Sequence, residues 1–291
     1  MQSSTIISFD LEEHMSIISI SRGSYTRGSD VAHKVAETLG YECISRDVLI
    51  DASEIFNIPE IKLVRAIHDA PSILERFSYG KERYVAYIRS ILLRHVQKDN
   101  VVYHGLAGHF FLQGIPHVLK VRIIADMEDR VREEMQRENI SNDKARYLLK
   151  KDDDERRKWG LTLYGIDTWD PSLYDIVLKI KTITVDDAVK FILATLQRPS
   201  FTTTPESQKI LDDLVLAAQI EAMLVNEFPR VKVVAKDGSA DIYIGTSLGM
   251  VASSAKEREA IYRVQEIAIS LGGAQSAQVH LTAGMPDDFI H

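Results

Sequence analysis

Four short apolar runs, separated by segments of helical character, constrain the fold of this chain more than any other feature. They lie at residues 16–21, 101–104, 118–124 and 176–180. Because each run is β-branched and apolar at consecutive positions, we expect strands that are buried on both faces. The helices predicted around them cover residues 30–39, 47–56, 81–98, 127–138, 141–158 and 186–197. Strands that alternate with helices predict an α/β fold, in which helices cover both faces of a parallel sheet.

The segment RPSFTTTPE, residues 198–206, predicts a linker, because prolines and threonines cluster there between two helical patterns. We therefore expect a larger domain over residues 12–197 and a smaller one over residues 207–283. The smaller domain is predicted to have the order α-β-β-α-β, a small α+β unit. Its elements are expected at 208–227, 231–236, 240–245, 255–271 and 277–282. The dipeptide Asp237-Gly238 between its first two strands is typical of a tight hairpin.

Composition excludes several classes of protein. The 291 residues carry a formal net charge of −7, which argues against a partner that is a nucleic acid polymer. No run reaches the roughly 18 apolar residues of a membrane span, and the acidic N-terminal segment does not resemble a signal peptide. The only cysteine, Cys43, excludes an intramolecular disulfide and suits a reducing compartment. We expect a cytoplasmic protein, with Cys43 as a small core residue.

The segment ISISRGSYTRGSD indicates a strand, a tight loop and the beginning of a helix near Asp30. Backbone N–H groups of such a loop converge with the positive end of the helix dipole, which favours an anion. The phosphate-binding pattern G-x-x-x-x-G-K-[ST] would begin at Gly23, but Ser29 stands in place of the lysine. The alternative is an ordinary strand-to-helix connection. The candidate phosphate-binding residues are Arg22, Gly23, Ser24, Thr26, Arg27, Gly28 and Ser29, and Ser29 is also the candidate Mg²⁺ ligand.

The segment DDDERRK concentrates charges on one predicted helix. Asp153 and Arg156 are three residues apart and share a helix face. A guanidinium matches phosphate oxygens bidentately, so Arg156 is the candidate for stabilising a transferred phosphoryl group. Asp153 would hold that arginine or contact an acceptor, and Lys158 would add positive charge. The alternative is a solvated helix face with weak ion pairs.

Two further places carry polar residues near predicted strand ends. Arg46 and Asp47 are candidates for binding an acceptor, with a helix cap as the alternative interpretation. His104 and His109 flank a glycine turn, but no third ligand lies at zinc-site spacing. The sequence therefore argues against a metal pair formed by these two histidines.

The order of segments in residues 16–197 resembles the cytidylate-kinase-like family, a branch of the P-loop nucleoside monophosphate kinases. Four stretches carry the likeness: ISISRGSYTRGSDVAHKVAETLG, YECISRDVL, VVYHGLAGHFFL with the following VLKVRIIADMEDRVREEM, and KKDDDERRKWGLTLYGIDTWDPSLYDIVL. The resemblance implies a P-loop kinase-like sheet, ATP and Mg²⁺, and phosphoryl transfer to a nucleotide or a small phosphorylated acceptor. The family's Gly-Arg turn is replaced here by Gly105-Leu106-Ala107, which argues against cytidylate as the acceptor.

The C-terminal segment resembles a BON-like module in its helix LVLAAQIEAML, its hairpin VKVVAKDGSADIYIG and the run IYRVQEIAISLGGAQSAQVHL. That resemblance implies binding of a protein partner or self-association, and no chemistry. Three functions therefore stay open, and one of them is a purely structural interaction protein. The first is an ATP-dependent phosphotransferase. The second is a catalytically weak nucleotide sensor whose C-terminal module reports the bound state to a partner or to another copy of the chain.

Overall fold

A computed structural model describes residues 15–23, 26–45, 47–59, 81–105, 108–245 and 254–282. Its larger part is a five-stranded sheet in the order β2-β3-β1-β4-β5, and every neighbouring pair is parallel. The strands are β1 (Ile17–Arg22), β2 (Glu42–Ile44), β3 (Val101–His104), β4 (Val118–Ala125) and β5 (Ile176–Ile180). The predicted parallel α/β sheet is confirmed, and β1 lies at its centre.

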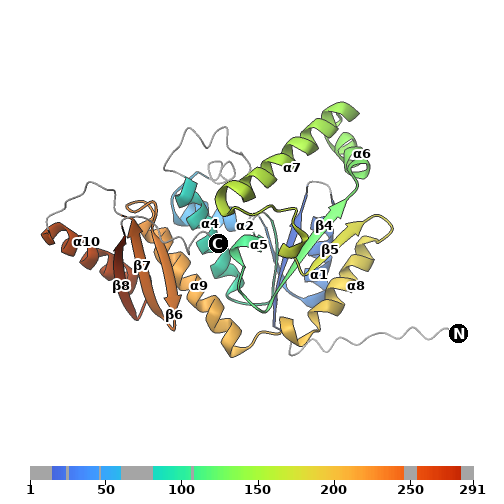
Figure 1. Ribbon diagram of the computed structural model, residues 1–291. Helices are drawn as coiled ribbons and strands as arrows, with labels where there is room; N and C mark the ends of the chain where they lie inside the picture. Colours follow the sequence, from blue (N-terminus) through green and yellow to red (C-terminus); the bar gives the residue numbers. More distant parts are fainter. Residues whose placement is uncertain are drawn as a thin grey trace.

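Helices cover both faces of this sheet, as the apolar runs predicted (Figure 1). They are α1 (Gly28–Leu39), α2 (Asp47–Ile55), α4 (Lys81–Val96), α5 (Gly108–Phe111), α6 (Met127–Glu138), α7 (Asn142–Tyr164) and α8 (Val185–Leu196). Successive residues of β1 point to opposite faces of the sheet. Ile18 packs with α1 and α8, whereas Ile17 packs with α2, α4 and α5. Each face of a central strand is thus buried, which explains why the strand is apolar at consecutive positions.

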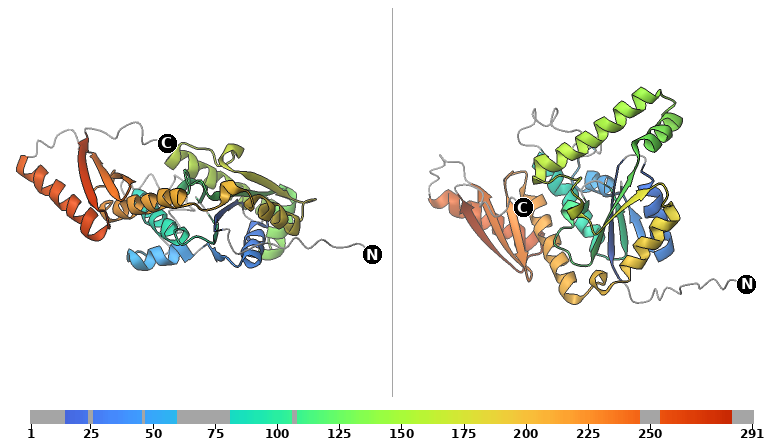
Figure 2. Two further views of the ribbon diagram at one scale, coloured as in Figure 1. Left: turned by 90° about the horizontal axis from the view of Figure 1, so that it is seen from below. Right: turned by 45° about the vertical axis from the view of Figure 1, so that its right-hand side comes forward.

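Local signals in the sequence place most helix ends. Gly40 ends α1 with a φ of 68°, in the left-handed region that glycine adopts without strain. Thr184 and Asp187 form a capping box at the beginning of α8. α7 continues to Tyr164, six residues beyond the predicted end, so Trp159 lies inside the helix. Figure 2 shows α6 and α7 as a pair that extends beyond the carboxyl edge of the sheet.

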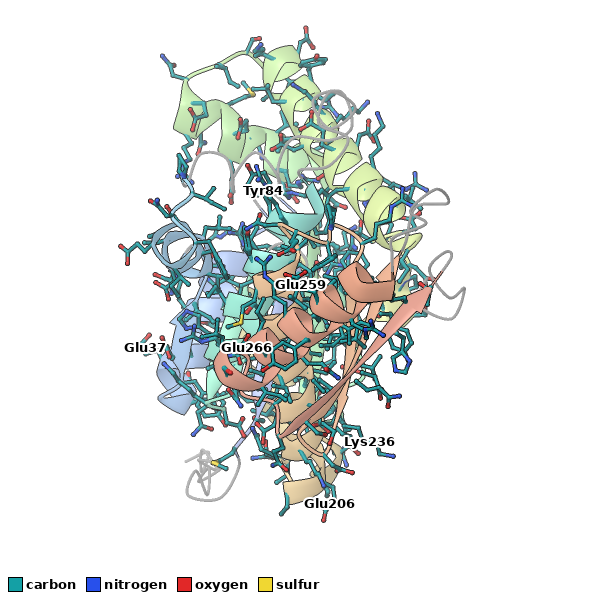
Figure 3. The ribbon with its side chains drawn as sticks, turned by 90° about the vertical axis from the view of Figure 1, so that its left-hand side faces the viewer. Glu37, Tyr84, Glu206, Lys236, Glu259 and Glu266 are labelled. Atoms are coloured by element: carbon teal, nitrogen blue, oxygen red, sulfur yellow. The ribbon has the colours of Figure 1, made fainter. Side chains whose placement is uncertain are left out.

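A second sheet of three strands forms the C-terminal unit. It contains β6 (Lys232–Lys236), β7 (Ser239–Gly245) and β8 (Ser276–Thr282), with β6 and β7 antiparallel and β7 and β8 parallel. The predicted hairpin is present, and both of its turn residues have positive φ, 55° at Asp237 and 77° at Gly238. The helices are α9 (Pro205–Leu224) and α10 (Ser254–Glu266), which a π-helical turn, Ile267–Leu271, extends. In Figure 3, Glu259 and Glu266 mark α10 in front of the strands, and Lys236 marks the end of β6.

Helix α9 packs against both parts of the chain. Leu211 and Val215 belong to the core that contains Ile17 and α4, whereas Ile220 and Leu224 belong to the core under β6, β7 and β8. The predicted linker contains the 3₁₀ turn Pro199–Phe201 and the first residues of α9. A domain boundary at 198–206 remains a prediction. None of the helices in the described ranges combines the length and apolarity needed to cross a membrane.

Candidate functional site

The connection from β1 to α1 lies at the carboxyl edge of the sheet, and close packing shapes it. A Cβ on Gly28 would lie 2.6 Å from the Cβ of Arg22, so only glycine fits there. A Cβ on Gly23 would lie 3.2 Å from Thr26 and 3.4 Å from the guanidinium of Arg130. The buried Thr26 hydroxyl donates to the Gly23 carbonyl at 3.1 Å, which holds the loop closed on itself. Gly28 thus lets the Arg22 side chain pack directly on the first turn of α1, where the helix dipole favours an anion.

The first turn of α1 presents polar groups to one side of this loop. Arg27 has a φ of 64° and precedes the helix without capping it. Its guanidinium donates to Asp30 at 2.7 Å and to Glu133 of α6 at 3.2 Å. Asp30 is thereby paired and lies at the surface. Ser29 is half-buried at the second position of the helix, and its neighbours leave its hydroxyl beside a large cavity.

Three arginines from three elements converge beside the loop. They are Arg22 at the end of β1, Arg130 on α6 and Arg156 on α7. Arg156 donates to the backbone carbonyl of Arg22 at 3.4 Å. Arg130 is buried and donates two hydrogen bonds to Asp153, at 2.7 and 2.9 Å. Asp153 thus neutralises Arg130 and fixes α7 to α6 next to the loop.

Arg22 and Arg156 both carry their charge in a partly buried environment. Burial and the neighbouring Arg156 lower the pKa of Arg22. Burial also lowers the pKa of Arg156, against the opposing effect of Asp152 and Asp153. Nε of Arg22 is buried and has no hydrogen-bond partner among the described residues. A buried donor of this kind favours an anion, because an unpaired buried charge costs more than a paired one.

Two cavities border this cluster. The larger, of about 720 Å³, lies between the beginning of α1 and α6 and is lined by Arg22, Ser29, Glu134 and Asp152 among others. The smaller, of about 50 Å³, is lined by Gly23, Asp153, Arg156 and residues of the sheet edge. Arg22 lines both of them. The larger volume lies within the range of about 300–1,000 Å³ that is usual for small-molecule sites.

The smaller cavity has a mixed aromatic and polar wall. Arg122 of β4 donates to the Thr168 carbonyl and, at 3.2 Å, to the hydroxyl of Tyr174. His109 of α5 is 5% exposed, and neither ring nitrogen has a partner among the described residues. Burial and the nearby Arg122 lower the pKa of His109 to about 3. The imidazole is therefore neutral at pH 7 and can donate or accept a hydrogen bond.

The structure brings together most, but not all, of the residues that the sequence singled out. Arg22, Gly23, Asp153 and Arg156 line the smaller cavity. Thr26, Arg27, Gly28 and Ser29 line the larger one. Lys158 is exposed on α7, and Asp47 accepts from the Ser45 backbone at 3.1 Å in the first turn of α2. Neither of these two side chains lines a cavity described here.

Four positions of interest lie outside the described residues. Ser24 was a candidate phosphate ligand, and Arg46 was a candidate acceptor ligand. Leu106 and Ala107 replace the Gly-Arg turn of the resembling family. The proposals that involve these four residues therefore rest on the sequence.

Sequence reasoning missed three residues that the structure places at the site. Arg130 is one of several arginines on a highly polar helix, and nothing in its local sequence distinguishes it from Arg132 or Arg137. The sequence pattern around His109 suggests only a metal ligand. Arg122 lies in a segment whose apolar pattern predicts a buried strand and no functional residue. The available signal for Arg122 is its charge within the mostly apolar run VLKVRIIA, a signal that Lys120 shares.

The donor groups suit a nucleoside triphosphate and a hard cation. The unpaired Nε of Arg22 and the closely packed Gly23 and Gly28 suit phosphate oxygens. Oε2 of Glu134 is buried without a partner among the described residues and lines the larger cavity together with Ser29. Carboxylate and hydroxyl oxygens are ligands that Mg²⁺ accepts.

Comparison with known proteins agrees with this geometry. A sequence profile described as the Cytidylate kinase-like family matches residues 17–182, more than half of the chain. The chain is 23% identical over 171 residues to the cytidylate kinase of Sulfolobus acidocaldarius, covering 58% of this chain and 88% of that protein.

Solved structures to which the chain is similar include an uncharacterised protein from Eubacterium ventriosum, with 22% identity, a TM-score of 0.48, and coverage of 63% of this chain and 99% of that one. The shikimate kinase from Acinetobacter baumannii, in complex with shikimate, has 16% identity and a TM-score of 0.36, over 63% of this chain and 94% of that one.

Proposed function

Because this chain belongs to the cytidylate kinase-like family, we propose that it binds ATP and transfers the γ-phosphoryl group to a nucleotide or another small phosphorylated acceptor. The observation that carries the proposal is the position of Arg22. It lines both cavities, at the end of β1 and beside the anion cradle. In the proposed complex, ATP occupies the larger cavity, and only the reacting group of the acceptor enters the smaller one, whose volume of about 50 Å³ does not hold a whole nucleotide.

Phosphoryl transfer needs alignment and positive charge more than covalent help from the protein. An acceptor oxygen forms a bond to the γ-phosphorus while the bond to the β,γ-bridging oxygen breaks, and ADP leaves. Arg22 and Arg156 stabilise the charge on the oxygens of the moving group, and burial strengthens their effect. Asp153 acts through Arg130, which it holds against the loop by two hydrogen bonds.

Magnesium fits the larger cavity, where Ser29 and Glu134 would hold it. When bound, Mg²⁺ neutralises phosphate charge and orients the triphosphate. Arg27 is engaged with Asp30 and Glu133, so its role in the proposed complex is to hold α1 against α6. His109 faces the acceptor and would recognise an uncharged hydrogen-bonding group on it.

A second candidate function rests on Ser29, which stands where the phosphate loop of an active kinase has its lysine. Without that charge, the site binds a nucleotide but turns it over slowly. In this case the protein is a nucleotide sensor, and the C-terminal unit contacts a partner or a second copy of the chain. Tyr262 and Leu271 of that unit are each 69% exposed and would form part of such a contact.

A ligand panel separates these functions. Thermal shifts are measured with ATP, GTP, CMP, dCMP, UMP and AMP, with and without Mg²⁺, because a ligand that binds only the native state raises the melting temperature. Both tryptophans of the chain, Trp159 and Trp169, line the smaller cavity. Their fluorescence therefore reports acceptor binding independently of turnover. ATP binding with ADP release supports the kinase, and ATP binding without release for any acceptor supports the sensor. No shift with any nucleotide would refute both.

We expect CMP and dCMP to be poor acceptors. Leu106 and Ala107 replace a charged turn, and a missing charge-assisted hydrogen bond costs roughly 1.5–3 kcal/mol, which corresponds to about ten- to a hundredfold in affinity. Coupled ADP-release assays over the monophosphate panel test this expectation. Rapid turnover of CMP at micromolar concentration would contradict it.

A further inference from the structure

Three side chains that commonly bind transition metals meet on the α1 face of the large sheet, outside both cavities. His33 lies on α1, Cys43 on β2 and His104 at the end of β3, and one ligand atom of each lies within 4.8 Å of the others. Cys43 pairs in register with Val102. Cys43 and His104 therefore point to the same face, because side chains two residues apart along a strand do so.

The contact between the two histidines brings α1 onto this face. Their rings meet edge to face, with the centroids 5.1 Å apart. His33 is exposed and Cys43 half-buried, so an ion can reach the cluster from solvent. Helix and sheet thus present three ligands around one point that solvent can reach.

A buried polar atom of this cluster lacks a hydrogen-bond partner in the described part of the chain. His104 is 4% exposed, and its Nδ1 makes no hydrogen bond within the described part of the chain. A buried ring nitrogen left unpaired costs free energy, and native proteins rarely tolerate it without a reason. Cys43 is a free thiol. The unpaired ring nitrogen and the thiol close to His104 together point to a ligand that the imidazole and the sulfur share.

We propose that His33, Cys43 and His104 form a zinc site, with water as the fourth ligand. Two imidazoles and a thiolate suit Zn²⁺, whereas Mg²⁺ prefers oxygen ligands. Zinc bonds of ~2.0–2.3 Å place tetrahedral ligand atoms roughly 3.5 Å apart. Small rotations of the side chains reach that separation from the observed arrangement. The Asp47 carboxylate interacts electrostatically with both Cys43 and His104 and adds negative charge beside the ion.

The site joins elements that are otherwise weakly connected. β2 is an edge strand of three residues, paired only with β3 among the described strands. A zinc ion bound to Cys43 and His33 fastens this edge to α1, the helix that forms the anion cradle. We therefore expect zinc to stabilise the folded chain even when no nucleotide is bound, because the zinc site and the proposed nucleotide site use different residues.

The single cysteine makes the test direct. The full-length protein, freed of metal with a chelator and then of the chelator, is titrated with Zn²⁺, and the rate at which a thiol reagent modifies Cys43 is followed. We expect one zinc per chain, modification at least about tenfold slower with zinc, and a higher melting temperature. Cobalt substitution should show tetrahedral ligand-field bands together with a sulfur-to-metal charge-transfer band.

Variants identify the ligands. His33→Ala removes an exposed side chain and should fold normally, yet it should weaken zinc binding at least about tenfold. Cys43→Ala should lose the sulfur-to-metal band. His280→Ala, a histidine in the C-terminal unit, is the control and should bind zinc like the wild type. Equal thiol modification rates with and without zinc, or unchanged affinity in His33→Ala, would overturn the proposal.

Discussion

Arg156 is the side chain whose removal best tests the proposed chemistry. It is half-buried, donates to the Arg22 carbonyl and lines the smaller cavity beside Arg22. A charge that acts mainly in the transition state changes turnover more than affinity. We expect Arg156→Ala to lower kcat by about a thousandfold, with only a modest loss of ATP affinity in a thermal-shift titration.

The matched control for Arg156 is Lys150→Ala. Lys150 is exposed on the same helix and also carries one positive charge. It should keep wild-type turnover. Similar rates for Arg156→Ala and the wild type would mean that the charges of α7 are a solvated face and nothing more.

His109 determines part of the pH dependence of stability. Its pKa in the folded chain is lowered from 6.5 to about 3, first by burial and then by Arg122. Below its ordinary pKa, the unfolded chain therefore binds a proton that the folded chain does not. The stability from this group is complete above pH 6.5 and is lost as the pH falls towards about 3. Between these two pH values, the contribution of His109 to the free energy of unfolding changes by about 1.4 kcal/mol per pH unit.

Urea unfolding at a series of pH values between about 6.5 and 5 measures this effect. The side chain of His109→Asn does not titrate in this range. The free energy of unfolding of the variant should therefore fall less steeply than that of the wild type as the pH decreases, and the difference between the two should reach about 2 kcal/mol over this window. An unchanged slope would show that His109 is accessible to protons in the folded protein.

At the scale of elements, the end of α7 is held against the loop that closes the smaller cavity. Gly160 lies at this contact, and a Cβ there would lie 2.8 Å from Thr168 and 2.9 Å from the Ile166 carbonyl. Thr168 in turn accepts a hydrogen bond from Arg122. The packing of this glycine therefore positions Trp159 and Arg156 over the cavity.

We expect Gly160→Ala to destabilise the protein by about 1–3 kcal/mol, although alanine favours a helix over glycine by about 1 kcal/mol. The reason is that helix and loop must separate to accommodate the methyl group. Urea unfolding measures the loss, and Lys150→Ala is again the control, because it places alanine on α7 without a new contact. If Gly160→Ala were more stable than the wild type, the helix and the loop at Thr168 would have room for the methyl group, and the prediction would be wrong.

At the scale of the whole molecule, α9 couples the two sheets. Leu211 is fully buried in the core of the large sheet, while Ile220 of the same helix is fully buried in the core of the small one. We expect Leu211→Ala to cost about 2–5 kcal/mol and to weaken both units together. Hydrogen exchange at the amides of β1 and β7 measures the two units separately.

Ile210→Ala is the control for Leu211, since Ile210 is the neighbouring residue and is 42% exposed. The Ile210→Ala variant should leave hydrogen exchange at the amides of both β1 and β7 unchanged. Faster exchange in β1 alone after Leu211→Ala would contradict the coupling. Such a result would favour the predicted boundary at 198–206, with two units that unfold independently.

Local sequence patterns predict the parallel sheet, the strand-loop-helix at Gly23–Ser29 and the hairpin at Asp237 and Gly238. Each of these depends on local physics: apolar runs that must be buried, backbone that must pass closely, and φ values that favour glycine. The position of Arg156 on a helix beside Asp153 also followed from spacing. The spacing does not predict which part of the fold this helix faces.

Which charged residues act together depends on the packing of helices and strands in the folded chain. Arg130 joins the site because Val131 is buried beside it and fixes the rotation of α6. His104 and His109 are near neighbours in sequence, yet His109 enters the smaller cavity while His104 turns towards His33 and Cys43. Helix rotation and strand register bring such residues together, and both depend on packing between segments far apart in the chain. No local pattern records that packing, so the arginine cluster and the zinc ligands became visible only in the folded molecule.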